Sequence, residues 1–212
     1  MTAARIRGKA VPPLVPEVGS VQVLLVGEAP GPRGADKSGI PFFGDAAGRH
    51  LYTALTRLGA MTLPEAVEAM PWDGALFAAH ALRPLPHGVA LGNAYDRCPT
   101  DDGERFRAPT RAELEGPANL RRIGREIEAL RARGLTGIVT LGRVAARTVQ
   151  AVRAQLVMDD LHLAAVPHPS AQGLLSMAPN RGRGARMADL QEAWIQQCMA
   201  AVQAAGFTGH AT

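Results

Sequence analysis

The hydrophobic pattern of the chain alternates between short apolar runs and longer stretches with helical spacing. Four runs predict buried strands, because they are short, rich in aliphatic side chains and bounded by turn residues. These runs cover residues 21–26, 75–82, 137–142 and 161–166. Helical spacing of apolar side chains predicts helices over residues 46–58, 63–70, 110–133, 143–153 and 185–205. This alternation favours a three-layer α/β/α fold with a four-stranded parallel central sheet.

The segments between these elements predict the domain organisation. Residues 1–19 contain several prolines and no clear hydrophobic period, so we expect an N-terminal arm ahead of a single domain over residues 20–212. Residues 83–109 are rich in proline, glycine and aspartate and predict a long loop, which in a compact domain is usually functional or mobile. Thr110 and Glu113 have the spacing of a capping box, which places a helix start there.

Composition narrows the class of protein. The chain has 212 residues, enough for one domain with a full core, and 47% of them are hydrophobic. No apolar run is long enough to span a bilayer, and the N-terminus lacks the apolar segment of a signal peptide, so we expect a cytoplasmic monomer without a membrane partner. Two isolated cysteines, Cys98 and Cys198, cannot supply a four-thiolate centre, and we expect no metal or cofactor.

The charge of the chain is weakly basic and is carried by arginine. The formal net charge is +4, and only Lys9 and Lys37 among the 23 basic residues are lysine. Arginine holds phosphate through paired hydrogen bonds, which fits nucleic-acid binding, although a genome rich in arginine codons gives the same bias. The sequence has no Walker loop, dinucleotide fingerprint, zinc-protease helix or nucleophile elbow, so those enzyme classes have no support.

The loop after the first predicted strand carries candidate chemistry. Glu28 and Asp36 lie where the carboxyl edge of the sheet is expected, and a carboxylate there can position water, act as a general base or bind a metal. The alternative is that Glu28 caps a turn and Asp36 is solvated. Phe42 and Phe43 follow in a turn rich in proline and glycine, where an aromatic ring can stack on a base, although one of the two is expected in the core.

His168 is a second candidate at the same edge. It lies between Pro167 and Pro169, directly after the fourth predicted strand. Both prolines have a fixed φ and no N–H, so this backbone is stiff and aims the imidazole at the rim that carries Glu28. A lone histidine is more often structural, and the setting leaves the two interpretations evenly matched.

The residues after His168 combine apolar and basic side chains. Ser170 can bond to the backbone or to phosphate, and Leu174 and Leu175 are followed by Arg181 and Arg183. Apolar wedges beside arginines are used to open a duplex and to hold its backbone. The alternative is a helix start that packs the leucines inward, followed by solvated arginines.

Three motifs, taken in order along the chain, resemble those of the uracil-DNA glycosylase superfamily. They are Gly-Glu-Ala-Pro-Gly at residues 27–31, Gly-Ile-Pro-Phe-Phe-Gly-Asp-Ala-Ala-Gly at residues 39–48 and His-Pro-Ser at residues 168–170. The pattern is most similar to the bacterial and archaeal family 4 type, and residues 141–146 also look like that family's third strand and helix start. The resemblance spans residues 21–170. It implies a four-stranded parallel sheet with helices on both sides and a pocket for a flipped base at the sheet's carboxyl edge.

The resemblance also implies roles for individual residues. Phe42 would stack on the flipped base, and His168 would contact a base carbonyl and stabilise the departing uracil anion. Leu174 or Leu175 would fill the gap left in the duplex. The water-activating and substrate-binding loop would consist of Gly27, Glu28, Ala29 and Gly31.

The chain departs from the family 4 pattern at three places. It lacks the four cysteines of the iron–sulfur cluster. The loop between Gly31 and Gly39 is one residue longer, so either Asp36 or Glu28 activates water. The family's second strand ends in an asparagine that reads the uracil edge, and here His80 takes that place, or Asn93 supplies the amide from the loop beyond.

From the resemblance we expect a DNA repair glycosylase that flips uracil, or another deaminated base, out of DNA and hydrolyses its N-glycosidic bond. Its partners would be uracil-containing DNA and, as product, free uracil. Two other hypotheses remain at this stage. One is a non-catalytic or covalently trapping protein that binds uracil in DNA, and the other is an α/β enzyme acting on a small nucleotide.

Overall fold

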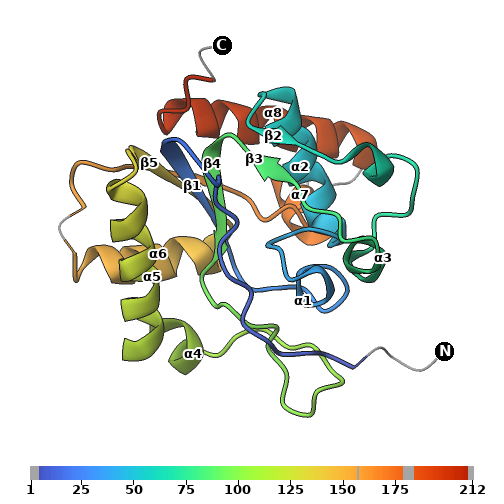
Figure 1. The fold of residues 1–212 in the computed structure, drawn as a ribbon, viewed down its shortest axis with the longest axis horizontal. Coiled ribbons are helices and arrows are strands. Elements are labelled where there is room, and N and C mark those ends of the chain that lie inside the picture. Colours follow the sequence, from blue (N-terminus) through green and yellow to red (C-terminus); the bar gives the residue numbers. More distant parts are fainter. Residues whose placement is uncertain (1–4, 157, 179–183, 210–212) are drawn as a thin grey trace.

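A parallel sheet of four strands forms the centre of the molecule (Figure 1). The computed structural model describes residues 5–156, 158–178 and 184–209. The strands, in chain order, are β1 (Val21–Gly27), β4 (Gly88–Asn93), β5 (Gly137–Leu141) and β6 (His162–Val166). Their order in the sheet is β4-β1-β5-β6, and every neighbouring pair is parallel. The predicted α/β class with a four-stranded parallel sheet is therefore confirmed.

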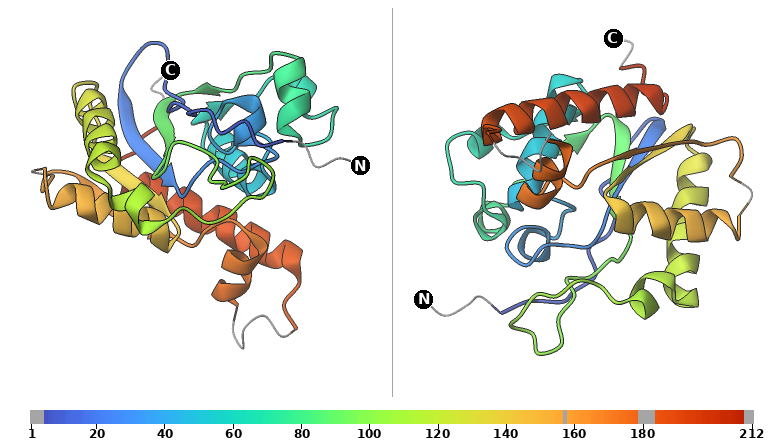
Figure 2. Two further views of the ribbon diagram at one scale, coloured as in Figure 1. Left: turned by 90° about the horizontal axis from the view of Figure 1, so that it is seen from below. Right: turned by 180° about the vertical axis from the view of Figure 1, so that it is seen from behind.

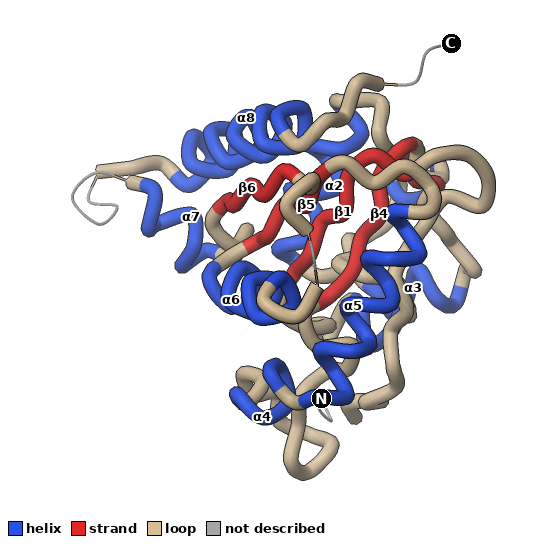
Figure 3. The backbone as a smooth tube through the Cα atoms, turned by 90° about the vertical axis from the view of Figure 1, so that its left-hand side faces the viewer, coloured by secondary structure: helices blue, strands red, loops and turns tan. Residues whose placement is uncertain are grey.

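Helices cover both faces of this sheet and make three layers. On one face lie α5 (Pro117–Arg131) and α6 (Arg143–Arg153), which Figure 3 shows in front of the strands. On the other face lie α2 (Ala46–Arg57) and the long α8 (Met187–Ala204), seen from behind in Figure 2. The remaining elements are short. They are α1 (Ala35–Ser38), β2 (Met61–Thr62), η1 (Glu65–Val67), α3 (Gly74–Ala79), β3 (Leu85–Pro86), α4 (Arg111–Glu115) and α7 (Ala171–Met177).

Strand β1 shows why the sheet needs two helical layers. Val23 and Leu25 belong to the core cluster shared with α2 and α8, whereas Leu24 and Val26 belong to the cluster shared with α5 and α6. Successive side chains of a strand point to opposite faces, so a continuous apolar run must be covered on both. Burying each such side chain fully contributes about 1.5–3 kcal/mol. Among the described residues, no helix is long and apolar enough to cross a membrane.

The predicted helix over residues 143–153 has the observed bounds of α6, and the capping box at the start of α4 is present. The expected single helix over residues 110–133 is wrong, because it breaks into α4 and α5. Gly116 has an extended backbone (φ −61°, ψ 142°), and Pro117 begins the second helix. A proline disfavours helical backbone in the residue before it but is well suited to the first helical position.

The second predicted strand is also wrong. Residues 75–82 contain most of α3 instead, and the strand is β4, within the segment predicted to be a loop. Asp73 caps α3, since its Oδ1 accepts hydrogen bonds from the backbone N–H groups of Ala75 at 2.8 Å and Leu76 at 2.9 Å. The predicted short helix over residues 63–70 contains only η1.

The N-terminal segment packs on the domain. Leu14 forms an isolated antiparallel bridge with Leu91 of β4, and the side chains of Ile6, Val11 and Leu14 are buried. This contact places Leu14 beside the outer edge of the sheet, where β4 is the terminal strand, and the N–H groups of Val11 and Ile6 donate to the carbonyls of Asp96 and Gly103 beyond it.

Candidate active site

The carboxyl ends of β1 and β4 place Gly27 beside Asn93, the last pair in their register. The ring of Phe42 lies directly against Gly27, because a Cβ there would be 2.6 Å from the Cε1 atom of Phe42. The same Cβ would be 3.2 Å from Oδ1 of Asn93. Only a glycine at this position allows the ring and the amide to approach the strand end together. The sheet edge thus combines an aromatic face and a side-chain amide.

Phe42 is held in an unusual backbone conformation. Its φ is +63°, in the left-handed region that residues with a side chain seldom occupy. Its carbonyl oxygen accepts a hydrogen bond from Asp45 N at 3.2 Å, and Gly48 of α2 lies so close to that carbonyl that a Cβ there would overlap it. Strained backbone of this kind clusters at functional sites.

Its neighbour Phe43 is a core residue. The ring is fully buried and stacks on Phe77 with centroids 4.3 Å apart, and it also contacts the rings of Tyr52 and Trp72. Phe42 belongs to the same core cluster and is only 6% exposed, but of the pair its ring is the one that lies against Gly27 at the strand end.

Asn93 is the polar centre of this edge. Its residue is 5% exposed, and its Nδ2 atom is buried without a hydrogen-bond partner among the described residues. A buried donor left unpaired costs about 1–3 kcal/mol, and such groups call for a specific explanation. Its position beside Phe42 makes the amide a candidate for binding a ligand.

The prediction that His80 ends the second strand is wrong. His80 is the exposed C-cap residue of α3, because the segment that contains it is helical. Asn93 occupies the strand end instead. The signal for it was present in the sequence, since a short run of Val, Ala and Leu bounded by glycines precedes it.

Glu28 follows β1 directly. Its backbone carbonyl accepts a hydrogen bond from Tyr95 N at 2.9 Å, which joins the two chain segments that leave β1 and β4. Its side chain is partly buried, and among the described residues the carboxylate has no hydrogen-bond or ion-pair partner. Burial raises the pKa of this carboxyl above its ordinary value of 4.5. A carboxylate that is desolvated and unengaged can hold a water molecule.

Asp36 is engaged elsewhere. Its residue is 3% exposed, and its two oxygens accept hydrogen bonds from the backbone N–H groups of Arg7 at 2.8 Å and Gly8 at 2.9 Å. Lys37 Nζ lies 3.0 Å from the same carboxylate. In this structure Asp36 fastens the N-terminal segment to the loop after β1.

A third carboxylate, Asp45, shapes that loop. Its oxygens accept hydrogen bonds from the backbone N–H groups of Gly34 at 3.0 Å and Ala35 at 3.1 Å, and Gly31 also donates to it. Burial raises the pKa of Asp45 more than these hydrogen bonds lower it. Asp45 therefore holds the chain between Gly31, the end of the predicted substrate loop, and Ala35, a role that the sequence did not reveal.

His168 lies at the same carboxyl edge, two residues beyond β6. The N–H of Ser170 donates to its Nδ1 at 3.2 Å, so in the neutral ring the proton is on Nε2, which becomes a donor. Burial lowers the pKa of this imidazole below 6.5 and favours the neutral form. Trp194 Nε1 donates to the carbonyl of Pro167 at 2.8 Å, and Gly142 packs against the His168 side chain. The imidazole is thus fixed in position and tautomer.

Of the described candidate residues after His168, some have structural roles and one is exposed at the surface. Ser170 is the N-cap of α7, where its Oγ accepts a hydrogen bond from Gly173 N at 3.3 Å. Leu174 is 1% exposed and belongs to the core, so it cannot enter a duplex, whereas Leu175 is 37% exposed. Arg181 and Arg183 lie outside the described residues.

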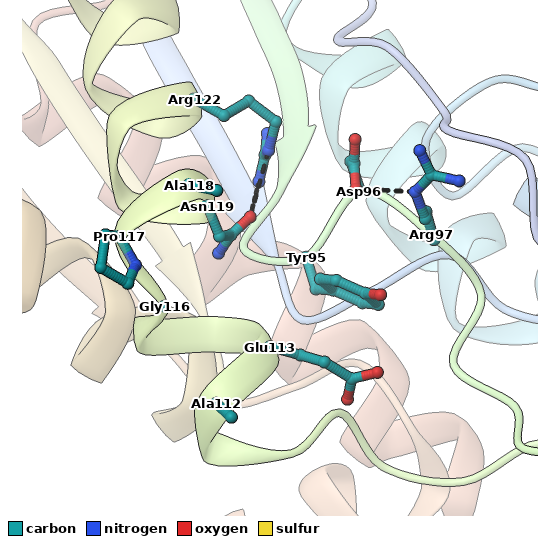
Figure 4. Close-up of a pocket in the computed structure, with 10 residues that line it drawn as sticks. All are labelled: Tyr95, Asp96, Arg97, Ala112, Glu113, Gly116, Pro117, Ala118, Asn119 and Arg122. Atoms are coloured by element: carbon teal, nitrogen blue, oxygen red, sulfur yellow. Dashed lines mark hydrogen bonds and ion pairs between the residues drawn. The ribbon is translucent and has the colours of Figure 1, made fainter.

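A cavity of about 380 Å³ lies near this edge but is separate from it (Figure 4). It is formed where the segment after β4 faces α4 and α5, and Tyr95, Arg97, Glu113 and Asn119 are among its lining residues. Gly27, Phe42 and His168 do not line it. The candidate site is therefore defined by the strand ends rather than by this cavity.

One family model covers most of the chain. A family model described as the uracil DNA glycosylase superfamily matches residues 15–194. The type-5 uracil-DNA glycosylase of Mycobacterium leprae (strain TN) is 46% identical over 57 residues, which cover 26% of this chain and 25% of that protein, so the match spans about a quarter of the relative's length. Among solved structures, wild-type SMUG2 of Pedobacter heparinus has a TM-score of 0.49 and 16% identity, over 85% of this chain and 76% of that chain.

Proposed function

The chain belongs to the uracil-DNA glycosylase superfamily, and we propose that it excises uracil from DNA as a repair glycosylase. The observation that carries this proposal is the unpaired Nδ2 of Asn93 beside the ring of Phe42. A flat apolar face next to an unsatisfied amide matches a nucleobase, which stacks through its ring and hydrogen-bonds through its edge.

The amide selects the base through its donor. Nδ2 of Asn93 donates to the carbonyl oxygen that uracil carries at the position of the cytosine amino group. Cytosine would present a donor to a donor, and both would stay unpaired in a buried site. Such polar mismatches give strong discrimination. Hypoxanthine carries a carbonyl on the same edge, so the proposal extends to other deaminated bases.

The base reaches this site only when it leaves the duplex. Flipping costs a few kcal/mol of stacking and pairing, and less for a mismatched uracil. Phe42 replaces the lost stacking, and Leu175, which is exposed on α7, fills the gap in the duplex. The exposure of Leu175 supports this part of the proposal. Arg181 and Arg183, which lie outside the described residues, are the arginines proposed to hold the phosphates.

In the proposed reaction His168 acts on the departing base, and Glu28 acts on the water that attacks the sugar. As the glycosidic bond breaks, negative charge grows on the base, and the fixed Nε2–H of neutral His168 donates to a base carbonyl. Donors prearranged in this way each contribute about 3–4 kcal/mol to a transition state that develops an oxyanion. Glu28 positions the water that attacks the sugar, since its carboxylate is unengaged, whereas Asp36 already accepts backbone hydrogen bonds.

The direct test uses oligonucleotides with one uracil, hypoxanthine or xanthine, single- and double-stranded, incubated with the purified protein and then treated with alkali. We expect strand scission at uracil, with N93A and H168A strongly impaired. No scission on any substrate would refute the proposal. A denaturation-resistant protein–DNA adduct would instead identify a covalent trap, and retained affinity for uracil-DNA without scission a non-catalytic binder.

A further inference from the structure

The backbone at the end of β4 is held by side chains from α5. Nη2 of Arg122 donates to the carbonyl oxygens of Asn93 at 3.0 Å and Ala94 at 3.1 Å. Nδ2 of Asn119 donates to the carbonyl of Ala94 at 2.8 Å. Figure 4 shows both side chains reaching from one side of the helix toward this strand end. The peptide groups that carry the Asn93 side chain are therefore tied to a helix.

Arg122 is itself fixed from two sides. Its Nη1 donates to both carboxylate oxygens of Glu126, at 2.7 and 2.8 Å, and its Nε and Nη2 donate to Oδ1 of Asn119 at 3.2 and 2.9 Å. Its side chain is only 18% exposed. A planar guanidinium can make this set of contacts at once, and a lysine ammonium cannot. We call Arg122, Asn119 and Glu126 the β4 brace.

The position of the β4 brace argues against a role in holding phosphate. The guanidinium of Arg122 is occupied by protein acceptors, and the carboxylate of Glu126 offsets its charge. The brace also lies at the wall of the 380 Å³ cavity, which Arg122 and Asn119 both line. These hydrogen bonds therefore add to the core packing around Ala94 in holding the backbone on this side of Asn93.

We propose that Arg122 is a positioning residue, which sets the direction of the Asn93 amide through the β4 brace and thereby tunes recognition of the base. This inference rests on the proposed function of Asn93 as the base-reading residue. The carbonyl contacts from α5 and the Ala94 N–H bond to Gly27 O at 2.8 Å restrict the backbone torsions here, so the Cα–Cβ bond of Asn93 leaves the strand end in a fixed direction. Small misplacements at a reacting centre are costly, by about 100-fold for a shift near 1 Å.

The kinetic test is a double-mutant cycle between R122Q and N93A, with single-turnover excision of uracil and inhibition by free uracil as readouts. We expect R122Q to lower the rate constant by about tenfold or more and to weaken uracil inhibition in parallel. In the N93A background R122Q should have almost no further effect, because the two residues act through one contact. Additive effects would overturn the proposal.

R111Q is the matched control. It removes the same charge and also breaks an arginine–glutamate pair four residues apart, Arg111–Glu115, which makes no contact with β4. R111Q should leave uracil inhibition unchanged, so an equal loss in both variants would show a charge effect and contradict the proposal. If R122Q fails to fold, R122K and N119A carry the test, because each removes contacts of the brace.

A second readout separates this inference from the proposed function. The Asn93 side-chain NH2 signals, assigned by their loss in N93A, can be followed by NMR in protein without substrate. We expect them to shift or broaden in R122Q and to stay unchanged in R111Q. Unchanged signals in R122Q would refute the positioning role even in an active enzyme. An inactive wild-type protein would refute the proposed function and leave the brace to be judged by these signals.

Discussion

Gly27 and Asn93 are partners at the last position of the β1–β4 pair, and the missing side chain of one makes room for the amide of the other. The Phe42 ring uses the same space, since its Cε1 would lie 2.6 Å from a Cβ on Gly27. The site thus depends on the absence of a Cβ atom at Gly27. A single substitution at Gly27 or Asn93 is therefore expected to displace the Phe42 ring or to remove the amide.

Gly27→Ala should displace the Phe42 ring and lower single-turnover excision by about 10- to 100-fold, because the base loses its stacking face. Overpacking of this kind also costs about 1–3 kcal/mol of unfolding free energy. The control is Gly92→Ala on β4, where a Cβ would meet its nearest neighbours at 3.9–4.0 Å, an ordinary contact. Equal activity of the two variants would show that the Phe42–Gly27 contact is unimportant.

Asn93→Leu should abolish excision and yet stabilise the fold. Leucine has a similar size and removes a buried donor that costs about 1–3 kcal/mol while unpaired. At about 2–4 °C per kcal/mol for a chain of this size, the melting temperature should rise by a few degrees. Asn119→Leu is the contrasting variant, because both N–H groups of Asn119 donate to carbonyls, and it should melt lower. A lower melting temperature for N93L would mean that its amide is satisfied.

The pH profile of excision identifies the carboxylate that positions water. Burial raises the pKa of Glu28 above 4.5, and the group works as a carboxylate, so the rate should fall as the pH drops through this raised pKa. E28Q should slow the reaction by about 100-fold or more and remove this acid limb. D36N should retain the limb and mainly lower stability, since Asp36 fastens Arg7 and Gly8. A limb that disappears in D36N but persists in E28Q would reverse the assignment.

His168 should act as a neutral donor. Burial lowers its pKa below 6.5, so the ring is neutral at pH values well above 6.5 and the rate should be flat there with respect to this group. H168A should lose about 100- to 1,000-fold in the chemical step, the cost of removing one prearranged donor. H168Q, which can offer an N–H from a similar distance, should retain more activity than H168A in single-turnover assays at pH 7–8. Equal rates for the two variants would exclude a donor role.

The sequence predicted the elements whose signals are local. The helix over residues 143–153 has a clear apolar period, and the capping box at Thr110 satisfies backbone donors within one turn. Strand β4 was missed because its glycines, Gly88 and Gly92, made it look like part of a loop. The alanine-rich run ending near Leu82 competed with it, although Asp73 caps this run as the helix α3.

The same limit applies to the site. The three motifs placed Glu28, Phe42 and His168 at one sheet edge, because the carboxyl ends of parallel strands meet there. Asn93 could be assigned only after β4 was known, since its role depends on strand register. The engagement of Asp36 by Arg7 and Gly8 and the burial of Leu174 depend on contacts between distant segments, which no local pattern records.

The bridge between Leu14 and Leu91 affects how strongly the protein aggregates at high concentration. Strand β4 is the terminal strand of the sheet, and all six of its residues are buried. Without the segment around Leu14, β4 would expose an unpaired apolar edge to other chains. Exposed apolar edges recruit further strands and lead to aggregation. We therefore expect the segment around Leu14 to protect the protein from aggregation, and its removal to promote self-association.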